Sequence, residues 1–382
     1  MDTVDREHNR IWATVDLDRL AENYHLIVRA AGGRPVMCVI KADAYGHGAV
    51  PVARRLTREG AGYFAVACAS EALELRRAGI DGQILLLGYA GEGDLPALLA
   101  GDVTLTAYDA ESAAVYSRAA VSLGRTARVH LKLDTGMSRL GLNAWEGEET
   151  LRQALAIARL PGIRVEGAFT HFAVADEPDK REQTQRQLTL FTGLCDQIRR
   201  AGVPLPLCHC ANSAGVLQYK NSHLDLVRAG IILYGYPPSD AVPLLPGLRP
   251  VMQVSARVAQ VRQLPAGAAI SYGGTAVLSS PRRVAVVTAG YADGFLRTGS
   301  GRARVVVGGM AVPVLGRICM DMCMVDVTDC PQPPRRGDEA VLFGDNPQHW
   351  DADAVARAAG TISYEVLCAV SRRVPRLYLG GR

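Results

Sequence analysis

Between residues 36 and 230, short apolar segments alternate with segments of helical periodicity, and this alternation constrains the fold more than any other feature. The helical segments, such as "SEALELRRAG", end in glycine, a common helix terminator. Eight strands separated by helices predict an α/β fold with a (β/α)8 barrel, and a doubly wound open sheet is the alternative. The predicted strands are Val36–Ile40, Tyr63–Ala67, Ile84–Leu87, Val103–Leu105, Val129–Leu133, Arg164–Ala168, Leu205–His209 and Leu226–Ala229.

The chain changes character after Tyr236. A proline-rich linker is predicted at "YPPSDAVPLLPGLRP", and β-branched runs with glycine and proline turns follow it. We therefore expect a barrel domain over residues 1–242 and a mainly β domain over residues 243–382. The barrel does not need the apolar segment "IWATVDLDRL" near the N-terminus, so we expect roughly the first 12–17 residues to pair with the second domain.

Composition argues against several classes of protein. The 382 residues carry a net charge of only +4, and no basic stripe is present, so we expect no nucleic-acid partner. No apolar run is long enough to cross a membrane, and the charged N-terminus does not resemble a signal peptide. The nine cysteines are scattered without a zinc-site spacing, so we expect a cytoplasmic protein with reduced thiols and no metal.

Polar residues follow five of the eight predicted strands. A (β/α)8 barrel carries its active site at the C-terminal ends of its strands, so these residues are expected to lie around one opening. Taken singly, a lysine after a strand is usually a solvated rim residue, and an isolated histidine is usually a satisfied core residue. Their common position favours a functional site instead. They are Lys41, Lys132 with Arg139, His171, Ser213, and Arg228 with Gly230.

The last two strands also suggest a phosphate site. Gly230 precedes Ile231 at the eighth strand, where a glycine allows close approach of the backbone to a phosphate. Ser213 opens a predicted helix, whose free amides favour an anion. A lysine facing a phosphate cradle suggests a Schiff base with pyridoxal 5'-phosphate (PLP), and an aldolase-type Schiff base without a cofactor is the competing interpretation.

Nine motifs are similar, in order, to those of the alanine racemases. The similarity runs from about residue 12 to the C-terminus, and the set is far more specific than the first motif alone. The motifs are "VIKADAYGHG", "LKLDTGMSRLG", "EGAFTHFAVADE", "ANSAG", "VRAGIILYG", "ISYGGT", "GYADGFLR", "GRICMDM" and "TISYEVLCAVSRRVPR".

This resemblance implies a PLP enzyme that interconverts L- and D-alanine as a head-to-tail homodimer with shared active sites. Lys41 matches the lysine that carries PLP and acts as base on one face of the substrate. Tyr272 matches the tyrosine that serves the other face from the second subunit. Racemisation removes a proton from one face of a planar carbanion and returns one to the other, which two fixed groups achieve without rotating the substrate.

The resemblance assigns further residues by position. Arg228 matches the arginine at the pyridine nitrogen, and His171 matches a histidine near the ring. Lys132 matches a lysine that is carbamylated in many members, and we expect the same modification here. The phosphate set is Tyr45, Ser213, Gly230, Ile231 and Tyr364; the substrate carboxylate set is Arg139 and Met320; and the entry funnel is Asp176, Arg297, Arg317 and Ile362.

Three alternatives stay open at this point. A serine or broad-specificity racemase is disfavoured by Tyr364, because related serine racemases have a smaller residue there. Barrel-type PLP decarboxylases use a glycine-triplet loop and a catalytic cysteine that are not found here. Non-catalytic PLP carriers resemble the barrel alone, without a second domain. The family also implies a role in supplying D-alanine for peptidoglycan, although a catabolic role is equally compatible with the sequence.

Overall fold

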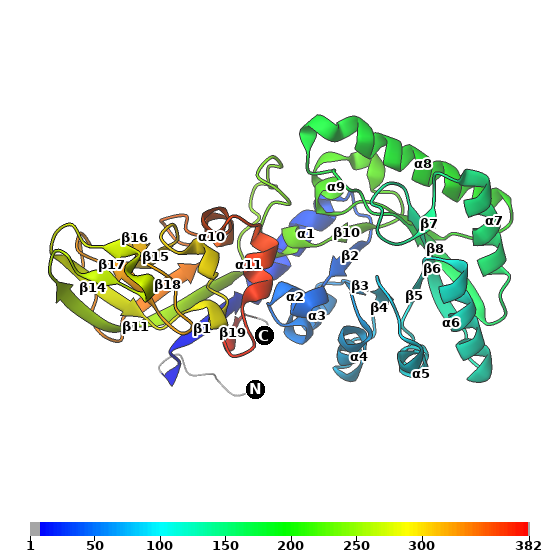
Figure 1. The fold of residues 1–382 in the computed structure, drawn as a ribbon. Helices are drawn as coiled ribbons and strands as arrows, with labels where there is room; N and C mark the ends of the chain where they lie inside the picture. Colours follow the sequence, from blue (N-terminus) through cyan, green and yellow to red (C-terminus); the bar gives the residue numbers. More distant parts are fainter. Residues whose placement is uncertain (1–7, 381–382) are drawn as a thin grey trace.

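The computed structural model describes residues 8–380 and contains a barrel and a mainly β domain, which confirms the predicted fold class (Figure 1). All eight predicted barrel strands are present, although the fourth and the seventh each begin two residues later than expected. The barrel strands are β2 (Val36–Val39), β3 (Tyr63–Val66), β4 (Gln83–Leu86), β5 (Leu105–Ala107), β6 (Ala127–Asp134), β8 (Ile163–Phe169), β9 (Leu207–His209) and β10 (Val227–Ala229).

Parallel pairing connects the barrel strands in two arcs. One arc has the order β10-β2-β3-β4 and the other the order β5-β6-β8-β9, with β7 (Leu142–Asn143) paired to the end of β6. A bridge between Leu85 and Thr104 joins the arcs on one side. On the other side, the Asp225 amide donates to the Cys208 carbonyl at 3.2 Å. These contacts close the ring of strands, so the C-terminal ends of all eight meet at one opening.

Helices surround the barrel and bury one face each. In α8, Leu188, Phe191, Leu194 and Ile198 recur every three or four residues and are buried, as expected of an amphipathic helix. The helices that follow the barrel strands or precede them are α1 (Leu17–Ala30), α2 (Lys41–Tyr45), α3 (Ala49–Arg58), α4 (Ala69–Arg77), α5 (Leu95–Ala100), α6 (Ala110–Ser122), α7 (Gly147–Ala158), α8 (Arg181–Arg200) and α9 (Ser213–Gln218).

The second domain is built around one long strand, β11 (Met252–Leu264). Its first half pairs with β18 and its second half with β14, so β11, β14, β17, β16, β15 and β18 form a closed ring. The other strands of the domain are β12 (Ala269–Ile270), β13 (Ala276–Val277), β14 (Arg282–Val287), β15 (Arg304–Val307), β16 (Met310–Leu315), β17 (Cys323–Asp326) and β18 (Glu339–Phe343).

Both ends of the described chain lie in this second sheet. The N-terminal strand β1 (Ile11–Asp16) runs antiparallel to β11, and β19 (Arg376–Leu379) runs parallel to β1. Helices α10 (Ala352–Ala359) and α11 (Ser363–Ala369) lie between the two domains (Figure 1). None of the helices in residues 8–380 has the length and apolar character needed to cross a membrane.

Candidate active site

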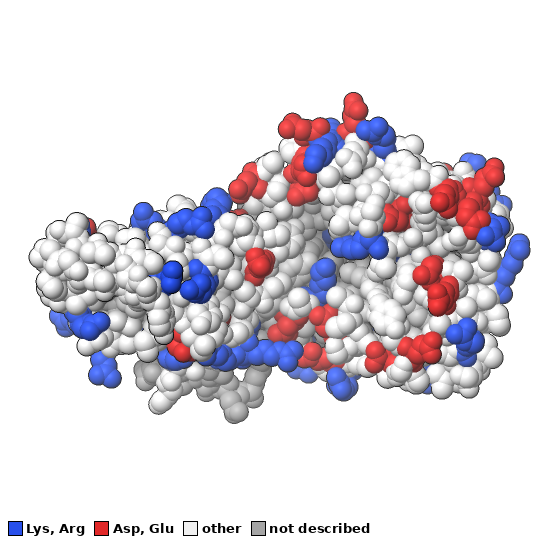
Figure 2. Space-filling view, in the orientation of Figure 1, with Lys and Arg blue, Asp and Glu red and all other residues white. Residues whose placement is uncertain are grey.

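A cavity of about 640 Å³ opens at the C-terminal ends of the barrel strands. Figure 2 shows a hollow on this face of the molecule, with lysine and arginine side chains beside it. The cavity brings together eleven of the sixteen predicted site residues. They are Lys41, Tyr45, Lys132, Arg139, His171, Asp176, Ser213, Arg228, Gly230, Ile231 and Tyr364.

Lys41 begins a turn with an unusual backbone. Residues Ala42, Asp43, Ala44 and Tyr45 all have φ between 52° and 54°, so α2 is one turn of left-handed helix. For residues other than glycine, this conformation costs roughly 1–2 kcal/mol each. The turn is therefore formed only because the surrounding protein holds it in place.

Several side chains provide that support. Glu71 accepts hydrogen bonds from the amides of Ala42 (2.6 Å) and Ala67 (2.8 Å), which joins the ends of β2 and β3. Nδ1 of the buried His47 lies 2.9 Å from the Ala44 carbonyl and 3.0 Å from that of Tyr45, so Nδ1 carries the proton. Asp43 accepts from the Ala49 amide at 2.7 Å. Asp43 and His47 are thus structural residues of the lysine turn.

The cavity is strongly cationic. Lys41 has a lowered pKa, first because burial disfavours the ammonium and then because Arg139 is nearby. Lys132 is only 5% exposed, and burial followed by the charges of Arg228 and Arg139 places its pKa well below the usual range. Its Nζ lies 4.5 Å from the centre of the Phe169 ring. Both lysines are therefore biased toward the neutral amine, which is the nucleophilic and basic form.

Asp134 shapes the loop that carries Arg139. Its carboxylate accepts hydrogen bonds from four successive backbone amides, those of residues 136–139, at 2.9–3.1 Å. Burial alone would raise the pKa of Asp134, but these donors lower it below its ordinary value. The loop is held by a carboxylate that stays ionised, so Arg139 is presented to the cavity from a rigid support.

Arg228 lies at the centre of a buried polar network. Its Nη1 donates to Nδ1 of His209 at 2.8 Å, and Nη2 donates to the Thr170 carbonyl at 2.7 Å. Since arginine only donates, the proton of His209 is on Nε2, which donates to Nδ1 of His130 at 2.9 Å. Within residues 8–380, Arg228 Nε has no acceptor, so this nitrogen remains for a ligand in the cavity.

Hydroxyl groups and backbone form a cradle at the last two strands. Ser213 begins α9 and accepts a hydrogen bond from the Gly230 amide at 3.2 Å. A Cβ added at Gly230 would lie 3.0 Å from the Tyr45 hydroxyl and 3.6 Å from Ser213 Oγ, so a larger residue would crowd the cradle. Burial raises the pKa of the Tyr45 and Tyr364 hydroxyls, which keeps both as neutral donors.

Five predicted residues do not line the cavity, namely Tyr272, Met320, Arg297, Arg317 and Ile362. All five lie within residues 243–382, where Tyr272 is 69% exposed and Met320 52% exposed. Ile362 precedes α11 and is 60% exposed. A single chain therefore does not bring Tyr272 to Lys41.

The structure also places residues in the site that sequence reasoning did not select. Phe169 and Cys368 line the cavity, and Glu71 holds the lysine turn. Phe169 ends β8, so a strand-end search that included apolar residues would have found it. Cys368 lies on α11, far from the barrel in sequence, and no local pattern marks it. No group of three histidine, cysteine, aspartate or glutamate side chains suited to a metal ion occurs among residues 8–380.

The barrel carries a buried amine, a hydrogen-bonded arginine and hydroxyl groups at its strand ends, and it is joined to a closed β domain. These features are those of a two-domain barrel enzyme with a site for an anionic ligand. Comparison with known families identifies which one. Residues 15–238 match the model of the alanine racemase N-terminal domain, and residues 251–378 match that of the alanine racemase C-terminal domain. The chain belongs to the alanine racemase family.

Relatives match along nearly the whole chain. An alanine racemase from Desulfovibrio desulfuricans is 44% identical over 372 residues, which cover 97% of this chain and 98% of that protein. A solved alanine racemase from Clostridium difficile superposes with a TM-score of 0.91 at 40% identity, covering 97% of this chain and 96% of the other. One from Streptomyces lavendulae gives a TM-score of 0.92 at 38% identity and 98% coverage of both chains.

Proposed function

We propose that the chain interconverts L-alanine and D-alanine with PLP as cofactor and two bases on opposite faces of the substrate. The observation that carries this proposal is the division of the predicted bases between two surfaces. Lys41 lies in a cationic cavity of the barrel, whereas Tyr272 is exposed on the other domain. The names of the relatives support the same reaction.

The cavity residues fit PLP. The cradle of Tyr45, Ser213 and Gly230 offers two hydroxyl groups and an uncrowded backbone for a phosphate, and Arg228 Nε suits a pyridine nitrogen. Tyr364 and Ile231 also line this end of the cavity. When bound, PLP supplies an electron sink for the electron pair left at Cα after deprotonation.

The chain's own groups then handle the proton. Lys41, whose pKa is lowered, acts as a neutral amine that removes the Cα proton on one face or returns it in the opposite direction. With PLP bound, Arg228 would donate a hydrogen bond to the ring nitrogen and keep its own proton, because a guanidinium is a poor acid. His171 stays neutral beside Arg228, since burial and then the Arg228 charge place its pKa well below the usual range.

Tyr272 is proposed to serve the second face from another copy of the chain. Its exposure on the second domain leaves it available to enter a cavity other than its own, which requires a head-to-tail homodimer with shared sites. Met320 is assigned to the substrate carboxylate from the same surface, opposite Arg139 in the barrel. Asp176 of the barrel and Ile362 before α11, with Arg297 and Arg317 of the second domain, are proposed to form the entry funnel.

Lys132 is proposed to carry a carbamate. A neutral lysine amine attacks carbon dioxide at carbon and releases one proton, which leaves an N-carboxylate anion. Burial among Arg139 and Arg228 favours both the neutral amine and the resulting anion. Protein equilibrated with ¹³C-bicarbonate should give a carbamate ¹³C resonance that is absent from Lys132→Met, whereas a bare Lys132 amine in the wild-type chain would refute the assignment.

Three further assignments rest on the family. The domain boundary is placed between residues 242 and 243, within the gap between the two family matches. The chain is proposed to act in the cytoplasm, where it would supply D-alanine for peptidoglycan. Alanine is proposed as the main substrate, because the bulky, partly buried Tyr364 narrows the cavity against larger amino acids.

The reaction is tested by incubating the purified protein with L-alanine in heavy water. Racemisation by two bases exchanges the Cα proton with solvent, and the same reaction abolishes the optical rotation of the alanine. Deuterium at Cα with full loss of rotation is the expected result. Release of carbon dioxide would instead indicate a decarboxylase, and deuterium exchange without loss of rotation would contradict a second base.

A further inference from the structure

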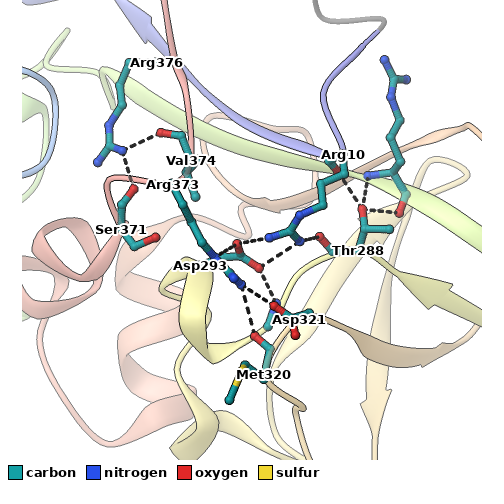
Figure 3. Close-up of polar contacts among 11 residues, drawn as sticks. Arg10, Thr288, Asp293, Met320, Asp321, Ser371, Arg373, Val374 and Arg376 are labelled. Carbon is teal, nitrogen blue, oxygen red and sulfur yellow. Dashed lines mark hydrogen bonds and ion pairs between the residues drawn. The ribbon is translucent and has the colours of Figure 1, made fainter.

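A buried carboxylate in the second domain connects the exposed surface that carries Tyr272 and Met320 to both ends of the chain. Asp293 has a side chain with no exposed area, although it lies only two residues from the exposed Tyr291. A buried carboxylate needs charged or hydrogen-bonding partners to offset its loss of hydration. Figure 3 shows these partners converging on Asp293 from separate segments.

Two arginines bind this carboxylate. Arg10 Nη2 lies 2.6 Å from Oδ1 and Arg373 Nε lies 2.8 Å from the same oxygen, while Oδ2 accepts from the Gly290 amide at 3.0 Å. Arg373 also reaches Asp321 at 2.7 Å and the Met320 carbonyl at 3.5 Å. The group of Asp293, Asp321 and the two arginines therefore balances its charges and fastens the loop that carries Met320.

The backbone continues this connection to Tyr272. The amides of Tyr291 and Ala292 donate to the carbonyls of Cys319 (3.0 Å) and Met320 (3.1 Å). Ser271, which directly precedes Tyr272, donates to the Arg317 carbonyl at 2.5 Å. The turns at residues 271–274 and 290–293 and the loop at residues 317–322 are thus one bonded unit, which we call the platform.

We propose that Asp293 is a positioning residue that sets the platform, and through it Met320 and Tyr272, against the cavity of the second copy. This inference rests on the proposed function. Replacing Asp293 with asparagine leaves Arg10 and Arg373 facing a neutral amide, so the loop at residues 317–322 loses its fixed position. Because the Met320 amide is assigned to the substrate carboxylate, substrate binding suffers more than the chemical step.

The test compares Asp293→Asn with a matched control in the same domain, Asp326→Asn. Asp326 is also largely buried, with an arginine at 3.7 Å, but it lies on β17 outside the platform. For the holoenzyme dimer, Asp293→Asn should raise KM for L-alanine at least fivefold with a smaller change in kcat, whereas Asp326→Asn should leave KM within twofold. Equal KM values for the two variants would overturn the inference.

A second measurement separates this inference from the proposed function. Amide hydrogen exchange over residues 317–322 should accelerate in Asp293→Asn and not in Asp326→Asn, whether or not the protein racemises alanine. If Asp293→Asn fails to fold, Arg373→Gln should accelerate exchange there more than Arg10→Gln, because only Arg373 contacts Met320. Unchanged exchange in these variants would overturn the inference, whereas an inactive wild-type protein would refute only the proposed function.

Discussion

The barrel cavity and the platform of the second domain differ in how far their functional residues are exposed to solvent. In the cavity, Lys132 and Arg228 are 5% and 3% exposed, so both side chains are held away from water. On the platform, Tyr272 and Met320 are 69% and 52% exposed and do not line the barrel cavity. One half of the site is assembled by folding, and the other half is presented to solvent and completed only by association.

The contrast extends to electrostatics. Burial lowers the pKa values of Lys41 and Lys132, and the charge of Arg139 lowers both further, so an anionic ligand would be attracted to the arginines of this cavity. On the platform, the charged group around Asp293 is internally balanced. The cavity therefore favours binding of an anionic ligand. The platform instead holds Tyr272 and Met320 in a fixed position.

The largest effect is expected from the cavity half. Lys41→Ala removes both the cofactor anchor and one base, so racemisation should fall by roughly 10⁴-fold or more. Chiral chromatography of the alanine product measures this loss. Lys180→Ala, a change at a half-exposed lysine that does not line the cavity, is the control and should be fully active. Activity of Lys41→Ala within tenfold of wild type would exclude the lysine as base.

The platform half should give the next largest effect. Tyr272→Phe keeps the ring but removes the phenolic proton, so the rate should fall by roughly 10²–10⁴-fold. Stability to urea should change little because the substitution keeps the ring and removes only the hydroxyl. A wild-type rate in this variant would contradict the assignment of Tyr272 as second base.

Mixing the two inactive variants tests whether the halves come from different copies. After dissociation and reassociation in equal amounts, about half of the dimers should be mixed, each with one intact site of two. About a quarter of wild-type activity should therefore return. No recovery in a mixture shown to exchange subunits would mean that each chain completes its own site.

The smallest effect is expected for the stability of the protein in acid, and it should come from His47 in the barrel. Burial lowers the pKa of His47 from 6.5 to about 4. As the pH falls, His47 is protonated in the unfolded chain before it is protonated in the folded chain. The stability that His47 contributes is therefore complete above pH 6.5, and roughly 3 kcal/mol of it is lost as the pH falls toward 4. Urea unfolding at pH 7.5 and 4.5 measures the free energy of unfolding that is lost in acid. This loss should be smaller in His47→Gln than in the wild type, whereas a change at the exposed His349, His349→Gln, should leave it unchanged.

Much of the cavity could be predicted from the sequence because parallel strands bring their C-terminal ends together. Lys41, His171, Ser213 and Arg228 could be placed at one opening by strand counting alone. The platform could not be predicted in this way. Tyr272 lies in an exposed turn with no periodic pattern, and only the family resemblance assigned it a role.

The conformation of the lysine turn also escaped prediction. Alanine and aspartate at residues 42–44 carry no glycine signal for positive φ, so local propensity argues against what the structure shows. The reason is that two of its supports are distant in sequence: Glu71 follows β3, and Arg376 of β19 donates to the Gly46 carbonyl at 3.0 Å. Contacts of this kind depend on the finished fold rather than on neighbouring residues.

The left-handed turn also limits what protein engineers can do with "VIKADAYGHG". Asp43 and His47 within the motif provide part of its support, but Glu71, Arg376 and the Tyr378 hydroxyl also hold it from outside. Transplanted into another barrel without those three partners, the decapeptide would relax to ordinary backbone angles and its lysine would point elsewhere. A graft of this reactive amine must therefore carry its distant supports along.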